Sequence, residues 1–385
     1  MSSRAFDVLI VGAGMVGAAC AETLSRRGMR IAVIEREAIG SGATAAGMGH
    51  LVVMDDNPEE LALTSYSLRL WNALLDSDGA HHEFSRCGTL WIAADDEELD
   101  AARLKRRTLN AHDIACELLD AQGLYQLEPR LRPGLAGGLR VSGDGITYPP
   151  GSARRLLDLA IQRGVRLLFG TVKSVDDGGV TLGNGERIGA AMVVVANGMG
   201  SSALLPELPI RPKKGHLLIT DRYPGFIRHQ LVELGYIKSA HASDGDSVAF
   251  NLQPRPTGQI LVGSSRQFDT IDKSAEPAMI RRMLAHAIGY LPELATLNAL
   301  RCWTGFRAAS PDGLPLVGPH PTRRNVWLAT GHEGLGITTS LATAELLADQ
   351  ILSVPSAIPF EPYLPSRFGA LAEHVHSHRH QAAHA

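Results

Sequence analysis

Three glycines at fixed spacing and one acid further along carry the clearest chemical signal in this chain. Gly12, Gly14 and Gly17 form a G-x-G-x-x-G pattern, and Glu35 follows them. In such a pattern the first glycine permits a tight turn, the second lets the backbone approach a pyrophosphate, and the third allows close helix–strand packing. Because a carboxylate at Glu35 can hold ribose hydroxyls, the spacing predicts a dinucleotide site.

The residues around these glycines predict the elements that such a site needs. Residues 6–11 are a short apolar run, typical of a buried parallel strand. Residues 18–27 then predict a helix that ends at Gly28, and residues 30–34 predict a second strand that ends at Glu35. A glycine-rich turn without a ligand is the alternative, but strand, glycine turn, helix, strand and acid together favour the dinucleotide.

Residues 39–50 are a long run of small side chains, which helps to decide whether the dinucleotide is FAD or NAD. Ser41 and Thr44 offer hydroxyl groups there, and the small neighbours would let a flat ring lie against the backbone. This favours FAD over NAD, with a flexible loop as the alternative. Arg36 could bind a phosphate on the ribose 2′ position, although Glu35 disfavours such a phosphate. The predicted contacts here are Gly12, Gly14, Met15, Val16, Gly17, Glu35, Arg36, Ser41, Gly42, Ala43, Thr44, Gly47, Met48 and Gly49.

A second strand, glycine turn and helix follow late in the chain. Residues 325–329 predict a buried strand, residues 331–338 a glycine-rich turn, and the following residues a helix that ends near residue 352. The positive end of that helix could stabilise negative charge on a reduced flavin. The predicted contacts in this turn are Gly331, His332, Gly334, Leu335, Gly336, Ile337 and Thr338.

These motifs together resemble the D-amino acid oxidase superfamily of FAD-dependent enzymes, which includes glycine oxidase and sarcosine oxidase. The resemblance rests on G-x-G-x-x-G, Glu35, the small-residue run, R-x-x-S-x-D-x-x-P-x-x-G from Arg307, and G-H-x-x-x-G-I from Gly331. It implies non-covalent FAD, since Cys302 lies off the position that carries covalent flavin in monomeric sarcosine oxidase. It also implies cofactor contacts at Val172, Ala196, Gly198, Gly305 and Arg307.

Arg307 is the leading candidate for substrate binding. A guanidinium can clamp a carboxylate through two parallel hydrogen bonds, and the resemblance assigns that role to this position. His50, Tyr236 and Lys238 are further catalytic candidates, and His216, Tyr148 and Asn251 lie in segments expected to face the same cavity. A structural role is the alternative for each.

Composition excludes several other classes of protein. The chain has 385 residues, 37 Lys and Arg against 40 Asp and Glu, and a formal net charge of −3. This balance predicts no nucleic-acid surface and no polybasic membrane patch. The four cysteines form no C-x-x-C pair, which disfavours zinc, iron–sulfur and disulfide-reductase chemistry.

Location and the chain ends also follow from the sequence. Residues 8–21 imitate a signal peptide, but the functional glycine spacing within them favours the dinucleotide turn. With no apolar run long enough to span a membrane, we expect a cytoplasmic protein without a transmembrane segment. The histidines of residues 369–385 favour a low-complexity or tag-like tail over a metal site, so no metal is predicted.

We expect an α/β protein in which a Rossmann-like FAD domain of the glutathione-reductase type is interleaved with an α+β substrate domain built on an antiparallel sheet. Alternating residues between 214 and 263 predict the strands of that second sheet. The expected FAD domain comprises residues 1–80, 145–205 and 301–352. Residues 81–144 and 206–300 would form the substrate domain, and residues 353–385 a tail with a disordered end.

The finer resemblance concerns the substrate and the partners. Residues 45–58, 331–340 and 362–368 are similar to the β subunits of D-hydroxyproline dehydrogenases and to opine-oxidase-like proteins. This implies hydride removal from cis-4-hydroxy-D-proline, a small amino-acid substrate, beside a second flavoprotein subunit and a small iron–sulfur subunit. The alternatives are a stand-alone oxidase of glycine, sarcosine or a D-amino acid that releases peroxide, and a non-catalytic FAD-bearing scaffold subunit.

Overall fold

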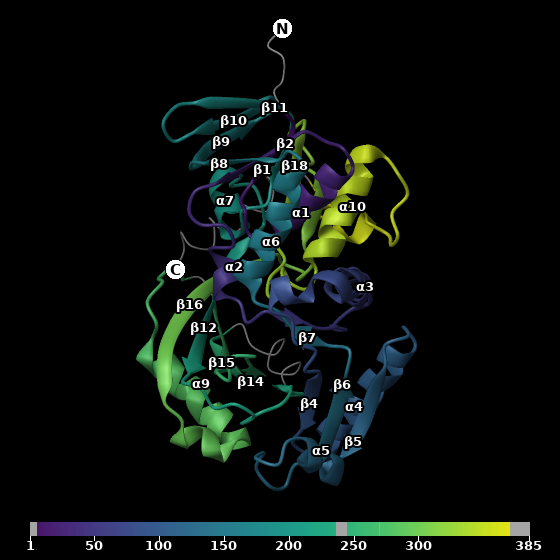
Figure 1. Ribbon diagram of the computed structural model, residues 1–385, viewed down its shortest axis with the longest axis vertical. Helices are drawn as coiled ribbons and strands as arrows, with labels where there is room; N and C mark the ends of the chain where they lie inside the picture. Colours follow the sequence, from purple (N-terminus) through teal and green to yellow (C-terminus); the bar gives the residue numbers. More distant parts are fainter. Residues whose placement is uncertain (1–5, 236–244, 269, 370–385) are drawn as a thin grey trace, which may run out of the picture.

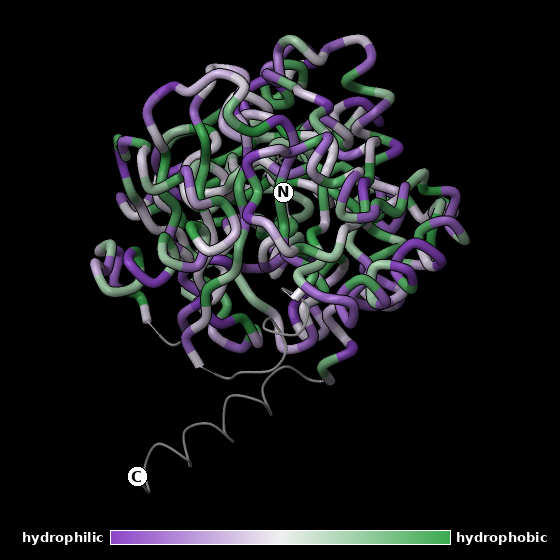
Figure 2. The backbone as a smooth tube through the Cα atoms, turned by 90° about the horizontal axis from the view of Figure 1, so that it is seen from below, coloured by the Kyte–Doolittle hydropathy of each residue, from purple (hydrophilic) through white to green (hydrophobic). Residues whose placement is uncertain are grey.

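The computed structural model describes residues 6–235, 245–268 and 270–369, and most of its strands belong to two large sheets. Figure 1 shows one sheet in the upper half, around β1 and β11, and the other in the lower half. Hydrophobic stretches run mainly through the interior, and hydrophilic stretches follow much of the outside (Figure 2). The predicted α/β class is confirmed.

The upper sheet is built on parallel strands in the order β17-β18-β11-β1-β2-β8, and β9 and β10 extend it from β11. All neighbours from β18 to β8 are parallel, whereas β17 is antiparallel to β18 and β10 to β11. The strands are β1 (Phe6–Val11), β2 (Ile31–Glu35), β8 (Arg166–Phe169), β9 (Val172–Asp176), β10 (Gly179–Leu182), β11 (Arg187–Val195), β17 (Leu316–Pro319) and β18 (Val326–Thr330).

Both faces of this sheet are covered, which explains why its strands are continuously apolar. Val8 and Ile10 of β1 pack into one core cluster, and Leu9 and Val11 pack into another on the opposite face. Residues of four helices complete the first cluster. They are α1 (Met15–Arg26), α3 (Pro58–Asp78), α6 (Pro149–Gln162) and α10 (Ser340–Leu352).

The lower sheet has the order β16-β12-β15-β14-β13-β4-β6-β5. Its strands are β4 (Thr89–Ala93), β5 (Cys116–Asp120), β6 (Gly137–Val141), β12 (Arg211–Thr220), β13 (Gln230–Glu233), β14 (Ser247–Pro254), β15 (Ile260–Phe268) and β16 (Ala299–Ala309). The sheet is mostly antiparallel as predicted, but β13 runs parallel to β4. The chain passes through the upper sheet between these two strands, and such a long connection permits a parallel pair.

Three helices accompany the lower sheet: α4 (Asp96–Asn110), α5 (Ala121–Leu127) and α9 (Pro277–Tyr290). Residues of α9 pack with alternate residues of β14 and β15, such as Leu252 and Val262, in one core cluster. The opposite face of these strands is therefore the one that can meet the upper sheet.

The remaining elements are short: α2 (Ala43–Ala46), β3 (His50–Leu51), β7 (Gly145–Ile146), α7 (Ser201–Leu204), and five 3₁₀ turns at Gly79–His82, Gly198–Gly200, Pro292–Thr296, Glu361–Tyr363 and Pro365–Phe368. The strand β3 pairs with β7 in a small separate sheet. The sequence interpretation did not anticipate β5, α5 or β13.

Two features bear on the expected division into domains. Residues 299–309 form β16, which pairs along its length with β12, so a boundary at residue 301 runs through a strand of the lower sheet. Residues 353–369 pack onto the protein, because Tyr363 is buried and its hydroxyl donates to Glu59 O at 2.7 Å. The histidine-rich end of the tail, residues 370–385, lies outside the described residues. None of the helices in the described ranges is long and apolar enough to cross a membrane.

Trp71 of α3 connects that helix to the turn before α10. The side chain is 0 % exposed, and its indole N–H donates to the carbonyl of Thr338 at 3.1 Å. Replacing it by Ala should lower the free energy of unfolding by about 3–5 kcal/mol, because a large cavity opens and the carbonyl loses its donor.

Chemical unfolding followed by far-UV circular dichroism measures this change. Leu104→Ala is the control, since Leu104 is 64 % exposed and its loss should cost less than about 0.5 kcal/mol. Equal unfolding midpoints for the two variants would contradict the role assigned to Trp71.

Candidate FAD and substrate site

The turn between β1 and α1 has the geometry that its glycines predict. Gly12 has a φ of +106°, and a Cβ there would lie 2.9 Å from Ala196 O. A Cβ on Gly17 would lie 2.0 Å from Gly12 O. Because neither position has room for a side chain, helix α1 begins directly against the carboxyl ends of β1 and β11.

The amino end of α1 is open to an anion. Gly14 caps the helix without a side-chain hydrogen bond, and the first turn contains no acidic residue. Thr44 of α2 lies beside it, because Met15 N–H donates to Thr44 Oγ1 at 3.0 Å. A Cβ on Gly14 would lie 3.2 Å from that oxygen. The bare backbone and the helix dipole therefore fit a pyrophosphate.

Glu35 is held rigidly at the end of β2. One carboxylate oxygen accepts the N–H of Ala13 at 2.8 Å, and the other accepts the N–H of Glu37 at 2.9 Å. Each oxygen retains a lone pair that can accept a ribose hydroxyl. Arg36 is exposed and pairs with Glu37 at 3.2 Å, so the guanidinium is directed to the surface.

Four other predicted cofactor contacts lie in turns or at the ends of short elements. Val172 begins β9, and Ala196 directly follows β11. Gly198 has a φ of +55° and Gly42 a φ of +63°, and a Cβ on either would meet no atom within 4 Å. Ser41 is half-buried, whereas Gly42 and Ala43 are exposed.

The small-residue run connects the two sheets. A Cβ on Gly305 of β16 would lie 2.4 Å from the Cβ of Ala46, and the Trp303 indole N–H donates to Ala46 O at 3.3 Å. Met48 packs with Leu217 and Leu261 of the lower sheet. Gly47 approaches the later turn, and Gly49 has a φ of +93° beside Thr147. A flat ring laid along this run would face the lower sheet.

The turn at residues 331–338 closes over the same region. A Cβ on Gly47 would lie 2.8 Å from Ile337 Cδ1, and one on Gly336 would lie 3.9 Å from Val16 Cγ2. Thr338 Oγ1 donates to His50 O at 2.9 Å, and Gly331 has a φ of +79°. The helix α10 begins at Ser340, a little later than a direct turn-to-helix junction would place it.

His332, one of the predicted cofactor contacts, has one ring nitrogen bonded within the protein. Its Nε2 lies 3.0 Å from Thr343 Oγ1 of α10, and burial lowers its pKa to about 3. The imidazole is therefore neutral and already bonded within the protein. Burial, with a smaller effect of Arg255, also lowers the pKa of His50 to about 4, so neither histidine supplies a charge at neutral pH.

Arg307 lies on the same face of β16 as Gly305. The strand pairs Arg307 with Lys213 and Gly305 with Gly215 of β12. Arg307 Nη1 donates to Ser265 O at 3.2 Å, and a Cβ on Gly215 would lie 3.0 Å from that nitrogen. Cys302 has the opposite strand parity and is exposed, so its thiol lies away from the face that meets the small-residue run.

A carboxylate already lies within the positive charge around Arg307. Glu333 is paired with Lys213 at 2.6 Å. Burial raises the pKa of Glu333, but the positive charges of Arg307, Lys213 and Arg266 outweigh burial and lower this pKa to about 2. The three cations therefore stabilise a carboxylate strongly at this position.

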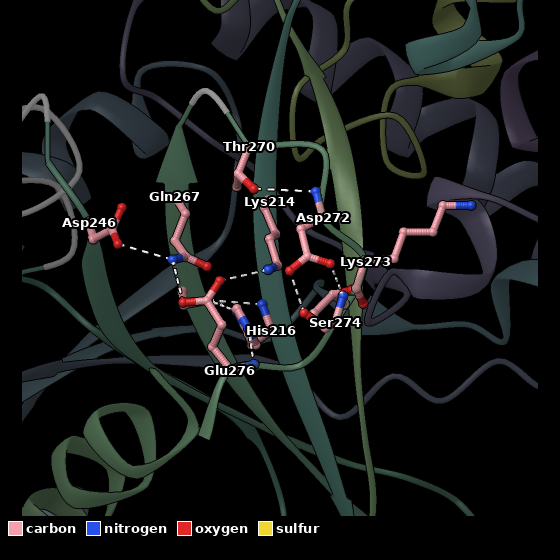
Figure 3. A network of polar contacts seen from close by, with 11 residues as sticks. Lys214, His216, Asp246, Gln267, Thr270, Asp272, Lys273, Ser274 and Glu276 are labelled. Atoms are coloured by element: carbon pink, nitrogen blue, oxygen red, sulfur yellow. Dashed lines mark hydrogen bonds and ion pairs between the residues drawn. The ribbon is translucent and has the colours of Figure 1, made fainter. Parts of the chain in front are cut away.

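The expectation that His216 faces the cavity is wrong. Figure 3 shows its contacts with the segment before α9, and Glu276 N–H donates to His216 Nε2 at 3.1 Å. Lys214, fully buried, pairs with Glu276 at 2.8 Å on the same side. Strand alternation thus places both side chains on the α9 face. Tyr236 and Lys238 lie outside the described residues.

Sequence reasoning missed several residues of this region. Lys213, Arg266 and Glu333 surround Arg307, and Gln230 and Gln253 are buried in the same sheet face as Asn251. The period of two from Lys213 to Gly215 and from Asn251 to Gln253 could have indicated a shared face. Nothing local marks Glu333, because its position depends on the turn in which it lies. No three His, Cys, Asp or Glu side chains of the described ranges could together hold a metal ion.

Comparison with known proteins agrees with this geometry. Residues 7–350 match the family model described as FAD dependent oxidoreductase, DAO. The chain belongs to this family. FAD is accordingly its cofactor, and the parallel sheet with its α1 turn is an FAD-binding Rossmann-like domain.

Individual relatives cover nearly the full length. A glycine oxidase of Pseudomonas aeruginosa is 30 % identical over 95 % of this chain and 99 % of that protein. The hydrogen cyanide synthase subunit HcnC of the same organism is 28 % identical, over 95 % and 97 %. The crystal structure of glycine oxidase from Geobacillus kaustophilus superposes with a TM-score of 0.83 and 26 % identity, covering 94 % and 98 % of the two chains. The chain is thus an enzyme of the family that contains amino-acid oxidases and dehydrogenases.

Replacing Gly14 by Val should reduce FAD affinity at least about tenfold, because the new side chain meets Thr44 and occupies the place of the pyrophosphate. Fluorescence titration of the deflavinated protein with FAD measures the affinity. Gly143→Val is the matched control, since a Cβ there meets no atom within 4 Å. Unchanged FAD affinity in Gly14→Val would contradict the assigned site.

Asp144, between β6 and β7, gives a pH-dependent contribution to stability. Burial raises its pKa to about 7, against an ordinary value of about 3.9 in the unfolded chain. The folded state therefore holds a proton that the unfolded state has released, and this contribution to stability is largest below about pH 4 and lost as pH rises to about 7.

Asp144→Asn should remove this dependence. We expect the melting temperature of the wild-type protein to fall more between pH 5 and pH 8 than that of the variant, as measured by differential scanning calorimetry. Asp177→Asn, at an exposed site, should follow the wild type. Parallel curves for wild type and Asp144→Asn would contradict the proton assignment.

Proposed function

We propose that this chain oxidises an α-amino acid and holds its carboxylate with Arg307. The observation that carries the proposal is the position of the Arg307 guanidinium, on the sheet face that Gly305 shares with the small-residue run. A guanidinium can bind a carboxylate through two hydrogen bonds and so fix the orientation of Cα. The depressed pKa of Glu333 supports the capacity of this cluster to stabilise carboxylates.

Bound FAD would accept the hydride that leaves Cα. The amine nitrogen donates its electron pair to Cα as the C–H bond breaks, and it loses a proton to give an imine that water can hydrolyse. Both His50 and His332 are neutral, so the site favours an amine that binds uncharged over one deprotonated by a strong base. Positioning by Arg307 and exclusion of water by the turn at residues 331–338 would supply most of the catalysis.

For the substrate and the electron acceptor, we propose a stand-alone oxidase of glycine, sarcosine or a D-amino acid, with oxygen as acceptor. Support comes from the glycine oxidase of Pseudomonas aeruginosa, which this chain matches over 99 % of its length. Nothing in this proposal requires a second subunit.

A second candidate has one specific observation in its favour. HcnC, a relative of similar length, is a subunit of a larger enzyme. This supports a catalytic dehydrogenase subunit that acts on cis-4-hydroxy-D-proline beside a second flavoprotein subunit and a small iron–sulfur subunit.

Anaerobic mixing of the purified protein with each amino acid, followed by admission of air, separates these readings. Loss of the flavin absorption with glycine, sarcosine or a D-amino acid, and rapid recovery in air with peroxide, is expected for the oxidase. Loss with cis-4-hydroxy-D-proline and recovery only with an artificial dye would support the dehydrogenase instead. No loss with any of them would contradict the proposed oxidation of an amino acid.

Arg307→Leu should lower kcat/KM by about 100-fold or more, because the carboxylate loses its clamp while the turn that binds the pyrophosphate is unchanged. Steady-state turnover with a dye acceptor measures the loss, and Arg307→Lys should recover part of it. Arg301→Leu is the matched control, since Arg301 is exposed on the same strand. Turnover in Arg307→Leu equal to that of the control would contradict the clamp.

A further inference from the structure

A row of carboxamide side chains crosses the sheet face that meets the small-residue run. We call Gln230, Asn251 and Gln253 the amide row. Asn251 pairs with Gly263 and Gln253 with Leu261, and both partners lie on the Met48 side: Leu261 packs with Met48, and a Cβ on Gly263 would lie 3.2 Å from Met48 Sδ. Residues directly opposite in an antiparallel pair share a face, so the row shares a face with Met48.

Each member of the row has a buried polar atom without a hydrogen-bond partner. The unpaired atoms are Gln230 Oε1, Asn251 Oδ1 and Gln253 Nε2. The other ends of both glutamines are fixed: Gln230 Nε2 donates to Gly145 O at 3.1 Å, and Gln253 Oε1 accepts Arg255 Nη1 at 3.3 Å. Gln230 and Gln253 are 0 % exposed, so water cannot bond to these atoms. Burying a polar atom without a hydrogen-bond partner costs free energy, and a bound ligand group could remove that cost.

The orphan atoms define the chemistry of that partner. Two of them accept and one donates, and His50 adds an unpaired Nε2 on a neutral ring nearby. Arg255 donates to Gln253 Oε1, and Asp144 is hydrogen-bonded to Thr89, so one basic and one acidic group lie next to the row. The group that best satisfies the row is therefore a neutral one that both donates and accepts, which describes a hydroxyl or a carboxamide.

The position of the row relative to Arg307 indicates which part of a substrate reaches it. Arg307 donates to Ser265 O, and Ser265 is paired with Val248, three residues before Asn251 on β14. The pairing of β14 with β15 is irregular between Val248 and Asn251, so the row lies on the neighbouring stretch of these two strands. The row therefore lies beside Arg307 along the sheet, where a part of the substrate other than its carboxylate could reach it.

We propose that the amide row is a specificity subsite for an amino acid whose side chain carries a neutral hydroxyl or carboxamide group. This inference rests on the proposed function, and it selects within that function against glycine and apolar side chains. A site built to hydrogen-bond such a group discriminates against the analogue that lacks it, because the analogue leaves the buried amides unpaired.

Two substrate pairs that differ by one hydroxyl test the wild-type enzyme. We expect kcat/KM, measured with a dye acceptor, to be at least about tenfold higher for D-serine than for D-alanine, or for cis-4-hydroxy-D-proline than for D-proline. This measurement needs no variant, so it does not depend on how a buried substitution folds. Equal values within both pairs would overturn the proposal.

The variants Gln253→Leu and Asn251→Leu then assign the preference to the row. In each variant, the ratio of kcat/KM for the substrate with the hydroxyl to kcat/KM for the substrate without it should fall toward one. The value for the substrate without the hydroxyl should stay within about threefold of the wild-type value. Gln126→Leu applies the same chemical change at an exposed position of α5 and should keep the wild-type ratio. An equal loss of kcat/KM for both substrates of a pair would assign the replaced residue a structural role and overturn the proposal.

The two levels of inference fail in distinguishable ways. Flavin that no amino acid reduces would remove the proposed function itself. Flavin that amino acids reduce, with no preference for a hydroxyl or with glycine as the best substrate, would leave that function standing and remove only the subsite.

Discussion

The close approach of Ala46 to Gly305 is the contact on which the site depends. A Cβ at Gly305 would lie 2.4 Å from that of Ala46, so the small-residue run can touch β16 only because this position has no side chain. The run also continues from the α1 turn through Thr44, which accepts the N–H of Met15. One backbone segment therefore sets the distance between the nucleotide-binding sheet and the sheet that carries Arg307. Because packed protein interiors contain few voids, a change at this contact would shift the two sheets relative to each other.

The electrostatics around Arg307 follow from the same arrangement. Three cations and one carboxylate are gathered from β12, β15, β16 and the turn before α10. Glu333 is paired with Lys213, whereas the Arg307 guanidinium donates to the backbone carbonyl of Ser265. A substrate carboxylate would then bind to one guanidinium of fixed direction. Such binding fixes the orientation of the substrate, which a diffuse positive surface would not do.

The local nucleotide motif was predictable because its meaning is contained in consecutive residues. Gly12 and Gly17 have no room for a Cβ, and each was recognisable from spacing alone. The α/β class and most strands followed from apolar periodicity for the same reason. His216 was misplaced because its face depends on strand parity, which a single histidine does not reveal. The positions of Glu333, Lys213 and the amide row depend on contacts between segments far apart in the sequence. The parallel β13–β4 pair depends on the path of the chain between these strands. No short stretch of sequence therefore predicts them.

The order in which the chain supplies its strands has a consequence for folding. The central strand β1 pairs with β11 and β2, and β11 in turn needs β18, which the chain supplies only after the whole lower sheet. A nascent chain emerging from the ribosome would thus expose the apolar edge of a half-built parallel sheet until its last quarter is made. Such a protein should reach its native state late in synthesis and as one unit, and truncation before β18 should give aggregation in place of a smaller folded domain.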